Sequence, residues 1–265
     1  MGSVGDVARL VALLIPAVQS VRQKAAQTEC ANHQRQVILG IHHYAAAHGQ
    51  LPQIDTSELK LSMFVVIHGF VYDGPMVTHG SQLRNGAYVC PSDPSSSAFP
   101  QQKLAHASYA ANAQVFYGAG TLNQKTRDGA SHTIAVAEHY YICDGNAKNE
   151  FLYPLNGFPF SYISHPHPAT FADGGARVPH PDRADVDNHP VPGPDGTTRG
   201  SLPGTFQHMP REKECDFRYA QTAHPSGMVT AMADGSVRIL SANITAATFW
   251  ALVSPDSQDF PGGDW

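Results

Sequence analysis

The residue pair whose types could carry out acid–base chemistry is His224 and Asp234, and Gly235 follows the aspartate. An imidazole and a carboxylate within hydrogen-bonding reach can act as general acid and base. In the structural interpretation, His224 begins a β-hairpin and Asp234 forms its turn, its carboxylate accepting from nearby backbone N–H groups. We favour the structural interpretation, because the chain contains neither Gly-x-Ser-x-Gly nor His-Glu-x-x-His. The sequence therefore predicts no catalytic residues and no enzymatic activity.

Three aspartates that fall close together, Asp182, Asp185 and Asp187, could bind a metal ion. Calcium prefers such clusters of oxygen ligands, although the spacing does not fit an EF-hand loop. His165 and His167 alternate with prolines, so their side chains point in different directions and do not help to chelate a transition metal. We expect a solvated acidic loop and no cofactor, with calcium as the alternative.

The four cysteines are Cys30, Cys90, Cys143 and Cys215, and no two of them form a Cys-x-x-Cys pair. They are either buried thiols or two disulfides in an exported protein, and three pairings are possible. Cys90 precedes a proline and Cys215 lies between charged residues, so both occupy loop positions where a free thiol adds little packing. We favour disulfides.

Binding surfaces are suggested by aromatic residues and by charge. Residues 151–162 contain five aromatic side chains, which either form core strands, the favoured interpretation, or a stacking platform for a sugar or peptide. The net charge of −5 and the absence of a basic run argue against nucleic-acid binding.

The element that must position much of the chain is one long helix, predicted over residues 7–48 from apolar residues at three- and four-residue steps. About 40 residues give a length of about 60 Å, more than the rest of this chain can cover. Residues 10–25 must therefore project or find a partner, and the expected assembly surface comprises Leu10, Leu14, Val18 and Val21.

The apolar run Leu10–Val18 is nine residues long, whereas a membrane-spanning helix needs about 20. From the opening Met1-Gly2-Ser3 we expect that native residues before about Val4 were removed. We expect membrane contact only if a native hydrophobic N-terminus is missing from this chain.

After the helix (residues 1–50) we expect a β-rich globular domain over residues 51–265. Residues 61–72 form a strand or a short buried helix, and residues 131–142 contain a strand. Asp-Gly pairs predict two similar hairpins, over 171–178 and 232–239, with type I′ turns. A short helix is expected over 245–253. Residues 179–204, with six prolines and four glycines, are expected to form a long exposed loop.

Several motifs occur in an order that is similar to a known family: Cys30-Ala31-Asn32, His42-His43-Tyr44, Tyr88-Val89-Cys90-Pro91-Ser92-Asp93, Ser108-Tyr109-Ala110-Ala111-Asn112, Val136-Ala137-Glu138, and His224-Pro225-Ser226-Gly227 followed by Asp234-Gly235. They resemble a large prepilin-like family of unknown function, abundant in planctomycete genomes, with a C-terminal His-x9-Asp-Gly motif. Members carry solute-binding or putative-transporter labels and are related to pseudopilins.

The resemblance implies an α+β, pilin-like fold with a long N-terminal helix packed on an antiparallel sheet, in an extracytoplasmic protein. It also implies the disulfide Cys30–Cys90, which leaves Cys143 and Cys215 as the second pair. We therefore expect a non-enzymatic structural subunit of a surface filament or secretion-type assembly, which contacts copies of itself or other pilin-like subunits through its helix. The alternative is a cell-surface module that binds a solute or glycan.

Overall fold

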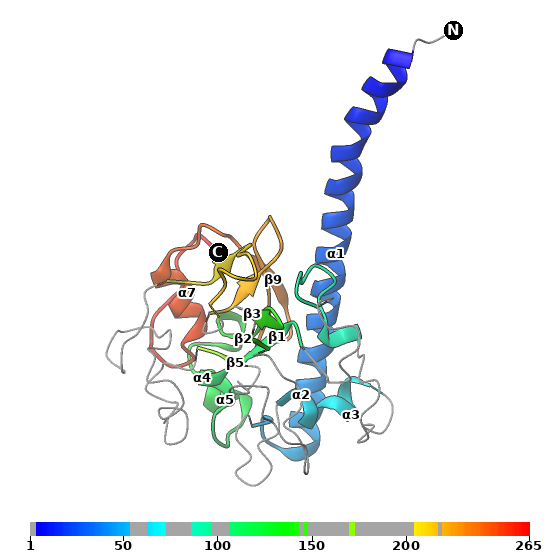
Figure 1. The fold of residues 1–265 in the computed structure, drawn as a ribbon. Coiled ribbons are helices and arrows are strands. Elements are labelled where there is room, and N and C mark those ends of the chain that lie inside the picture. The colour runs from blue at the N-terminus through cyan, green and yellow to red at the C-terminus, as the bar shows by residue number, and fades with distance from the viewer. Residues whose placement is uncertain are drawn as a thin grey trace.

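The computed structural model describes residues 4–53, 63–72, 86–96, 107–143, 146–147, 170–172, 204–216 and 219–265. The long helix α1 spans Val4–His48 and ends where Gly49 adopts a φ of +73°. This agrees with the predicted helix 7–48. The helix can end at Gly49 because glycine takes the left-handed conformation without steric cost. Figure 1 shows the N-terminal half of α1 projecting away from the rest of the protein.

The main sheet has five strands in the order β5-β1-β2-β8-β9: β5 (Thr170–Phe171), β1 (Tyr109–Asn112), β2 (Ile134–Glu138), β8 (Met228–Met232) and β9 (Val237–Leu240). All neighbours are antiparallel except β1 and β5, which run parallel. The predicted α+β fold class is confirmed, with a mixed sheet in which one parallel pair joins the antiparallel strands.

The sheet lies between two helices, as Figure 1 shows: the C-terminal half of α1 contacts β8 and β9, and α7 (Ala246–Val253) contacts β2. Because both faces are covered, every residue of β1, β2 and β8 is buried. Ala231 of β8 packs in the core beside α1, whereas Met228 and Met232 pack in the core beside α7.

Shorter elements surround this sandwich. They are α2 (Met63–Val66), α3 (His68–Val71), η1 (Gly86–Tyr88), α4 (Ala113–Phe116), α5 (Leu122–Lys125), η2 (Ala130–His132), β3 (Ile142–Cys143), β4 (Asn146–Ala147), β6 (Gln207–His208) and β7 (Gln221–Thr222). Residues 63–71 thus form two short helices, the first of them mostly buried, so the helix is the predicted alternative that the structure has. Helix α7 agrees with the predicted helix, and the Thr245 side chain caps it by accepting from the Thr248 N–H.

The hairpin of β8 and β9 is present, but its turn differs from the prediction. The Gly235 N–H donates to the Met232 carbonyl, and the Met232 N–H donates to the Ser236 carbonyl. Gly235 has a φ of +93°, and no other residue of this described turn has a positive φ. A type I′ turn would need a positive φ at Asp234 too. The type I′ prediction is therefore wrong, and glycine closes a three-residue loop.

Several predictions lie largely or wholly outside the described residues: the first hairpin beyond Ala172, the aromatic stretch 151–162, the histidines at 165 and 167, and the loop 179–204 except Gly204. Within the described part of the chain, no helix combines the length and hydropathy that a membrane span requires.

Candidate functional site

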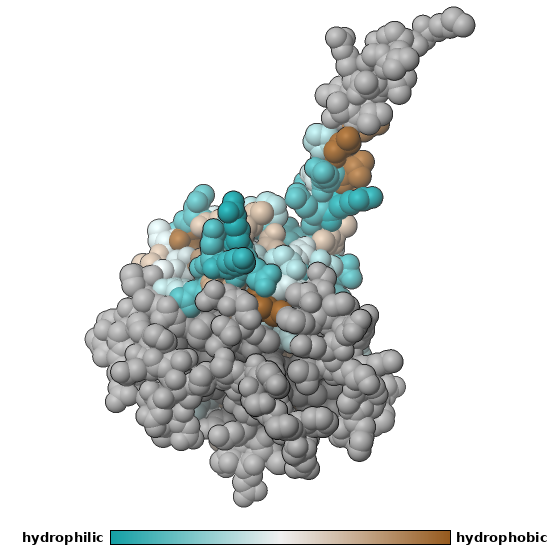
Figure 2. All heavy atoms as spheres, in the orientation of Figure 1, coloured by the Kyte–Doolittle hydropathy of each residue, from teal (hydrophilic) through white to brown (hydrophobic). Residues whose placement is uncertain are grey.

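The first candidate site is an exposed apolar face on the projecting half of α1. Residues 14–25 are all exposed, and the exposed fractions of Leu14, Ile15, Val18 and Val21 range from 48% to 67%. Figure 2 shows these side chains as apolar patches on the projecting helix. The backbone of Leu10 belongs to α1, but its side chain lies outside the described residues.

This exposed face points away from the globular part of the protein. At 3.6 residues per turn, Leu14, Val18 and Val21 lie within about 60° of one another around the helix axis. The buried residues Cys30 and Ile41 lie on the opposite side of the helix, about 160–180° from Leu14. We call Leu10, Leu14, Val18 and Val21 the outer stripe of α1.

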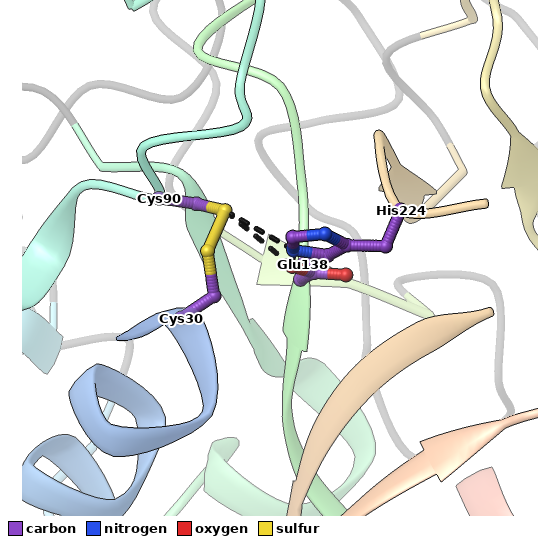
Figure 3. Close-up of side chains that lie close together, drawn as sticks. All are labelled: Cys30, Cys90, Glu138 and His224. Carbon is purple, nitrogen blue, oxygen red and sulfur yellow. Dashed lines mark hydrogen bonds and ion pairs between the residues drawn. A yellow bond between two sulfur atoms is a disulfide. The ribbon is translucent and has the colours of Figure 1, made fainter. Parts of the chain in front are cut away.

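The second candidate site is a buried cluster that fastens the other half of α1 to the sheet. A disulfide joins Cys30 of α1 to Cys90, which follows η1. Glu138, the last residue of β2, and His224, between β7 and β8, lie beside it, as Figure 3 shows. The Cys90 Sγ is 3.4 Å from the His224 Nε2 and 3.6 Å from the Glu138 Oε1.

Glu138 has hydrogen-bonding or ion-pair partners at both oxygens. Its Oε1 lies 2.9 Å from the His224 Nε2. Its Oε2 accepts from the Thr222 hydroxyl at 2.7 Å and from the Val229 N–H at 2.9 Å. All four residues are buried, so these contacts replace the water that the carboxylate loses on folding. Glu138 thereby joins β2 to β7, β8 and the segment between them.

The structure places His224 and Asp234 with different partners. The Asp234 Oδ1 accepts from the Ser236 N–H at 2.8 Å and from the Ser236 hydroxyl at 2.7 Å, within the hairpin turn. His224 contacts Glu138 and also begins a tight turn, because its carbonyl accepts from the Gly227 N–H. Gly227 has a φ of +125°, and a Cβ there would lie 2.0 Å from the Leu240 carbonyl oxygen. Only glycine therefore fits at this position.

Asp93 forms a second buried network that fixes the chain after Cys90. Its carboxylate accepts from the Ser95 N–H and hydroxyl, the Ser108 hydroxyl and the Tyr141 N–H. Burial, Glu138 and Asp93 raise the pKa of the buried Tyr109 phenol, which donates to the Cys30 carbonyl. The tyrosine therefore stays neutral at physiological pH.

Sequence reasoning missed Glu138 and Asp93 as partners, although both lie in quoted motifs. The available signals were a carboxylate ending the apolar strand Ile134–Glu138 and a carboxylate three residues after Cys90. Neither signal identifies the residue across the fold that it contacts.

The second disulfide joins Cys143 of β3 to Cys215. The two disulfides predicted from the cysteines are therefore present, with the pairing that the resemblance implies. Disulfides are typical of proteins in oxidising, extracytoplasmic compartments. The calcium candidates Asp182, Asp185 and Asp187 lie outside the described residues.

In a comparison with known protein families, residues 72–247 match a family described as protein of unknown function (DUF1559). No curated protein and no solved structure matches the chain. The matched range includes Cys90, Glu138 and His224 and leaves out Cys30. Since it covers more than half of the chain, the protein belongs to this family of unknown function.

Proposed function

We propose that the protein is a non-enzymatic, extracytoplasmic, pilin-like structural subunit that assembles with further copies of itself through the outer stripe of α1. The observation that carries this proposal is the exposure of Leu14, Val18 and Val21 on a helix half that projects from the globular part. A long helix whose second half packs on a sheet, and two disulfides, also support the proposal.

A second copy suits the outer stripe because the stripe faces away from the globular part. Two helices can therefore approach along it without a collision of their globular parts. Full burial of a Leu or Val side chain contributes about 1.5–3 kcal/mol. Leu14, Val18 and Val21, each about half exposed, thus contribute about 2–5 kcal/mol per helix, or about 4–10 kcal/mol for two facing helices, against an association cost of about 4–15 kcal/mol. Stable assembly then requires contacts with more than one neighbour, as in a filament.

The test is the double substitution Leu14→Asp/Val18→Asp in the full native chain, in cells that make it. We expect the loss of surface filaments in immunogold electron microscopy, with the globular part still folded. The matched control is Gln19→Asp/Gln23→Asp, which adds the same charges to the same exposed helix half on its other face. Filaments that persist in the first variant would contradict the proposal.

The alternative function, binding of a solute or glycan, depends on the aromatic residues 151–162. These lie outside the described residues, and no observation in the described chain favours that function.

A further inference from the structure

The buried cluster of Cys30, Cys90, Glu138 and His224 brings together four side chains that can bind a metal ion, whereas a structural cross-link needs only the two cysteines. One ligand atom from each side chain can be chosen so that all four lie within 4.8 Å of one another. Two sulfurs, one imidazole nitrogen and one carboxylate oxygen are ligand types that zinc binds. Four protein ligands and full burial are the features of a closed structural zinc site.

The distances in the cluster are close to those of a tetrahedral zinc site. Zinc–ligand bonds of usual length place a sulfur about 3.5 Å from an imidazole nitrogen and about 3.6 Å from a carboxylate oxygen. The observed distances from the Cys90 Sγ are 3.4 Å to His224 and 3.6 Å to Glu138. The nitrogen and oxygen, now 2.9 Å apart, would separate to about 3.4 Å.

The largest difference is the distance between the two sulfurs. They are 2.08 Å apart in the disulfide, and zinc requires about 3.8 Å. Breaking the disulfide removes this restraint, so that one sulfur can move aside while Cys90, His224 and Glu138 stay nearly in place. The disulfide and the metal are therefore alternative states of one cluster.

The hydrogen bonds of Glu138 already orient it as a ligand. The Thr222 hydroxyl and the Val229 N–H both donate to Oε2, which leaves Oε1 directed at His224 and Cys90. Partners of this kind fix the orientation of ligating side chains and raise metal affinity.

We propose that this cluster is a redox-dependent zinc site, in which the chain with Cys30 and Cys90 reduced binds one Zn²⁺ through both thiolates, the Glu138 Oε1 and the His224 Nε2. Reduction of the Cys30–Cys90 disulfide consumes two electrons and two protons. A second dithiol supplies them and is itself oxidised to a disulfide. Zinc then displaces the two thiol protons. When a second disulfide accepts the two electrons and two protons and becomes a dithiol, the Cys30–Cys90 disulfide forms again and the metal is released. With Zn²⁺ bound to two thiolates and one carboxylate, the site carries one net negative charge. The Thr222 hydroxyl and the Val229 N–H donate hydrogen bonds to this carboxylate.

Either state joins α1 to the segment after η1. The disulfide ties α1 to the segment after η1, and the zinc ion would tie these two to the end of β2 and to the segment before β8. The zinc state would thus keep the covered half of α1 attached to the sheet before the cysteines are oxidised. This inference is independent of the assembly proposed above, because the outer stripe takes no part in it.

The test uses the full chain after reduction with a water-soluble phosphine. The phosphine is oxidised to its phosphine oxide, and the oxygen atom of the oxide comes from water. The chain is reduced in denaturant, because the disulfide is buried, and refolded with Co²⁺ or Zn²⁺ as the probe. We expect one metal per chain, sulfur-to-cobalt charge-transfer absorption and tetrahedral d–d bands. The oxidised chain should bind none, and a Cys143→Ser/Cys215→Ser variant should bind as the wild type does.

Substitutions separate the proposed site from adventitious binding. We expect His224→Ala and Glu138→Gln to weaken binding about 100-fold or more, and Thr222→Val to weaken it about 10–100-fold. His132→Ala, at a histidine that packs against Trp265, should leave affinity unchanged. A reduced chain that folds without metal uptake, or stays unfolded with metal present, would overturn the proposal. Binding that is equal in wild type and in Cys30→Ser/Cys90→Ser would also overturn it.

Discussion

The two halves of α1 carry apolar residues at similar helical spacing, yet they meet different surroundings. In residues 30–41, Cys30, Val37, Ile38 and Ile41 are buried, and this half of α1 contacts the sheet, η1 and the short helix α3. In residues 14–25 every side chain is exposed, including Leu14 and Val18. The apolar faces of the two halves also point to opposite sides of the helix. One helix thus presents an inner face to its own sheet and an exposed outer face, which we propose contacts a second copy.

Helical periodicity therefore identifies an apolar face but not what covers it. The covered half is held by a disulfide, by the Gln34 side chain donating to the Val229 carbonyl at 2.8 Å, and by a close approach at Gly40. The described contacts of the projecting half include nothing comparable. The substitutions below test this contrast.

Removing the disulfide of the covered half should have the largest effect on stability. Cys30→Ala/Cys90→Ala removes a cross-link between residues 60 positions apart. The unfolded chain then gains conformational entropy, which lowers stability by about 4 kcal/mol. We expect the free energy of unfolding in urea to fall by that amount. The matched control is Cys143→Ala/Cys215→Ala, in which the covered half of α1 should stay attached to the sheet. If the first variant lost less than about 1 kcal/mol, the disulfide would not be what fastens α1.

Truncating a side chain of the covered half should come next. Ile41 is almost fully buried, and Ile41→Ala leaves a cavity that costs about 2–5 kcal/mol. Chemical denaturation checks this value, with Ile15→Ala on the projecting half as the matched substitution. Equal losses at the two positions would show that the projecting half is covered in the isolated protein.

A smaller effect is expected where α1 approaches α3 most closely. A Cβ on Gly40 would lie 2.4 Å from the Val71 Cγ2, and such overpacking costs about 1–3 kcal/mol. Alanine is more favourable than glycine inside a helix by about 1 kcal/mol, and this gain offsets part of the overpacking cost. Gly40→Ala should therefore destabilise the protein by about 1 kcal/mol net. Adding Val71→Ala removes the clashing atom. Thermal unfolding should then show less than additive loss in the double variant, whereas additivity would argue against this contact.

The smallest effect on stability is expected in the outer stripe. Val21→Ala removes two methyl groups that are largely exposed, so the free energy of unfolding should change by less than about 0.5 kcal/mol. Its effect should instead appear in assembly, measured by sedimentation of the native surface fraction. A large loss of stability with intact assembly would reverse the roles that we assign to the two halves.

The sequence predicted the elements that depend on local patterns. The spacing of apolar residues predicted α1 to within a few residues of its ends, and Gly49 marked its end. The Asp234-Gly235 pair predicted the position of the last hairpin, although only Gly235 has the positive φ that a type I′ turn needs at both residues.

Long-range pairings could not be predicted in this way. Glu138 meets His224 across 86 positions of sequence, and β5 pairs parallel to β1 across about 60. Such contacts depend on how the strands are ordered, whereas periodicity describes only each segment by itself. The acid–base interpretation pairs His224 with Asp234, ten residues away, whereas the turn directs that carboxylate at Ser236.

Site-specific cross-linking tests the central claim about the outer stripe most directly. A cysteine is placed at Val21, on the stripe, or at Gln23, on the opposite face of the same exposed helix half. Both variants are expressed as the full native chain and oxidised on intact cells. Covalent dimers from Val21→Cys, with little product from Gln23→Cys, would agree with assembly through the outer stripe. No dimers from Val21→Cys, or equal yields from both variants, would contradict it.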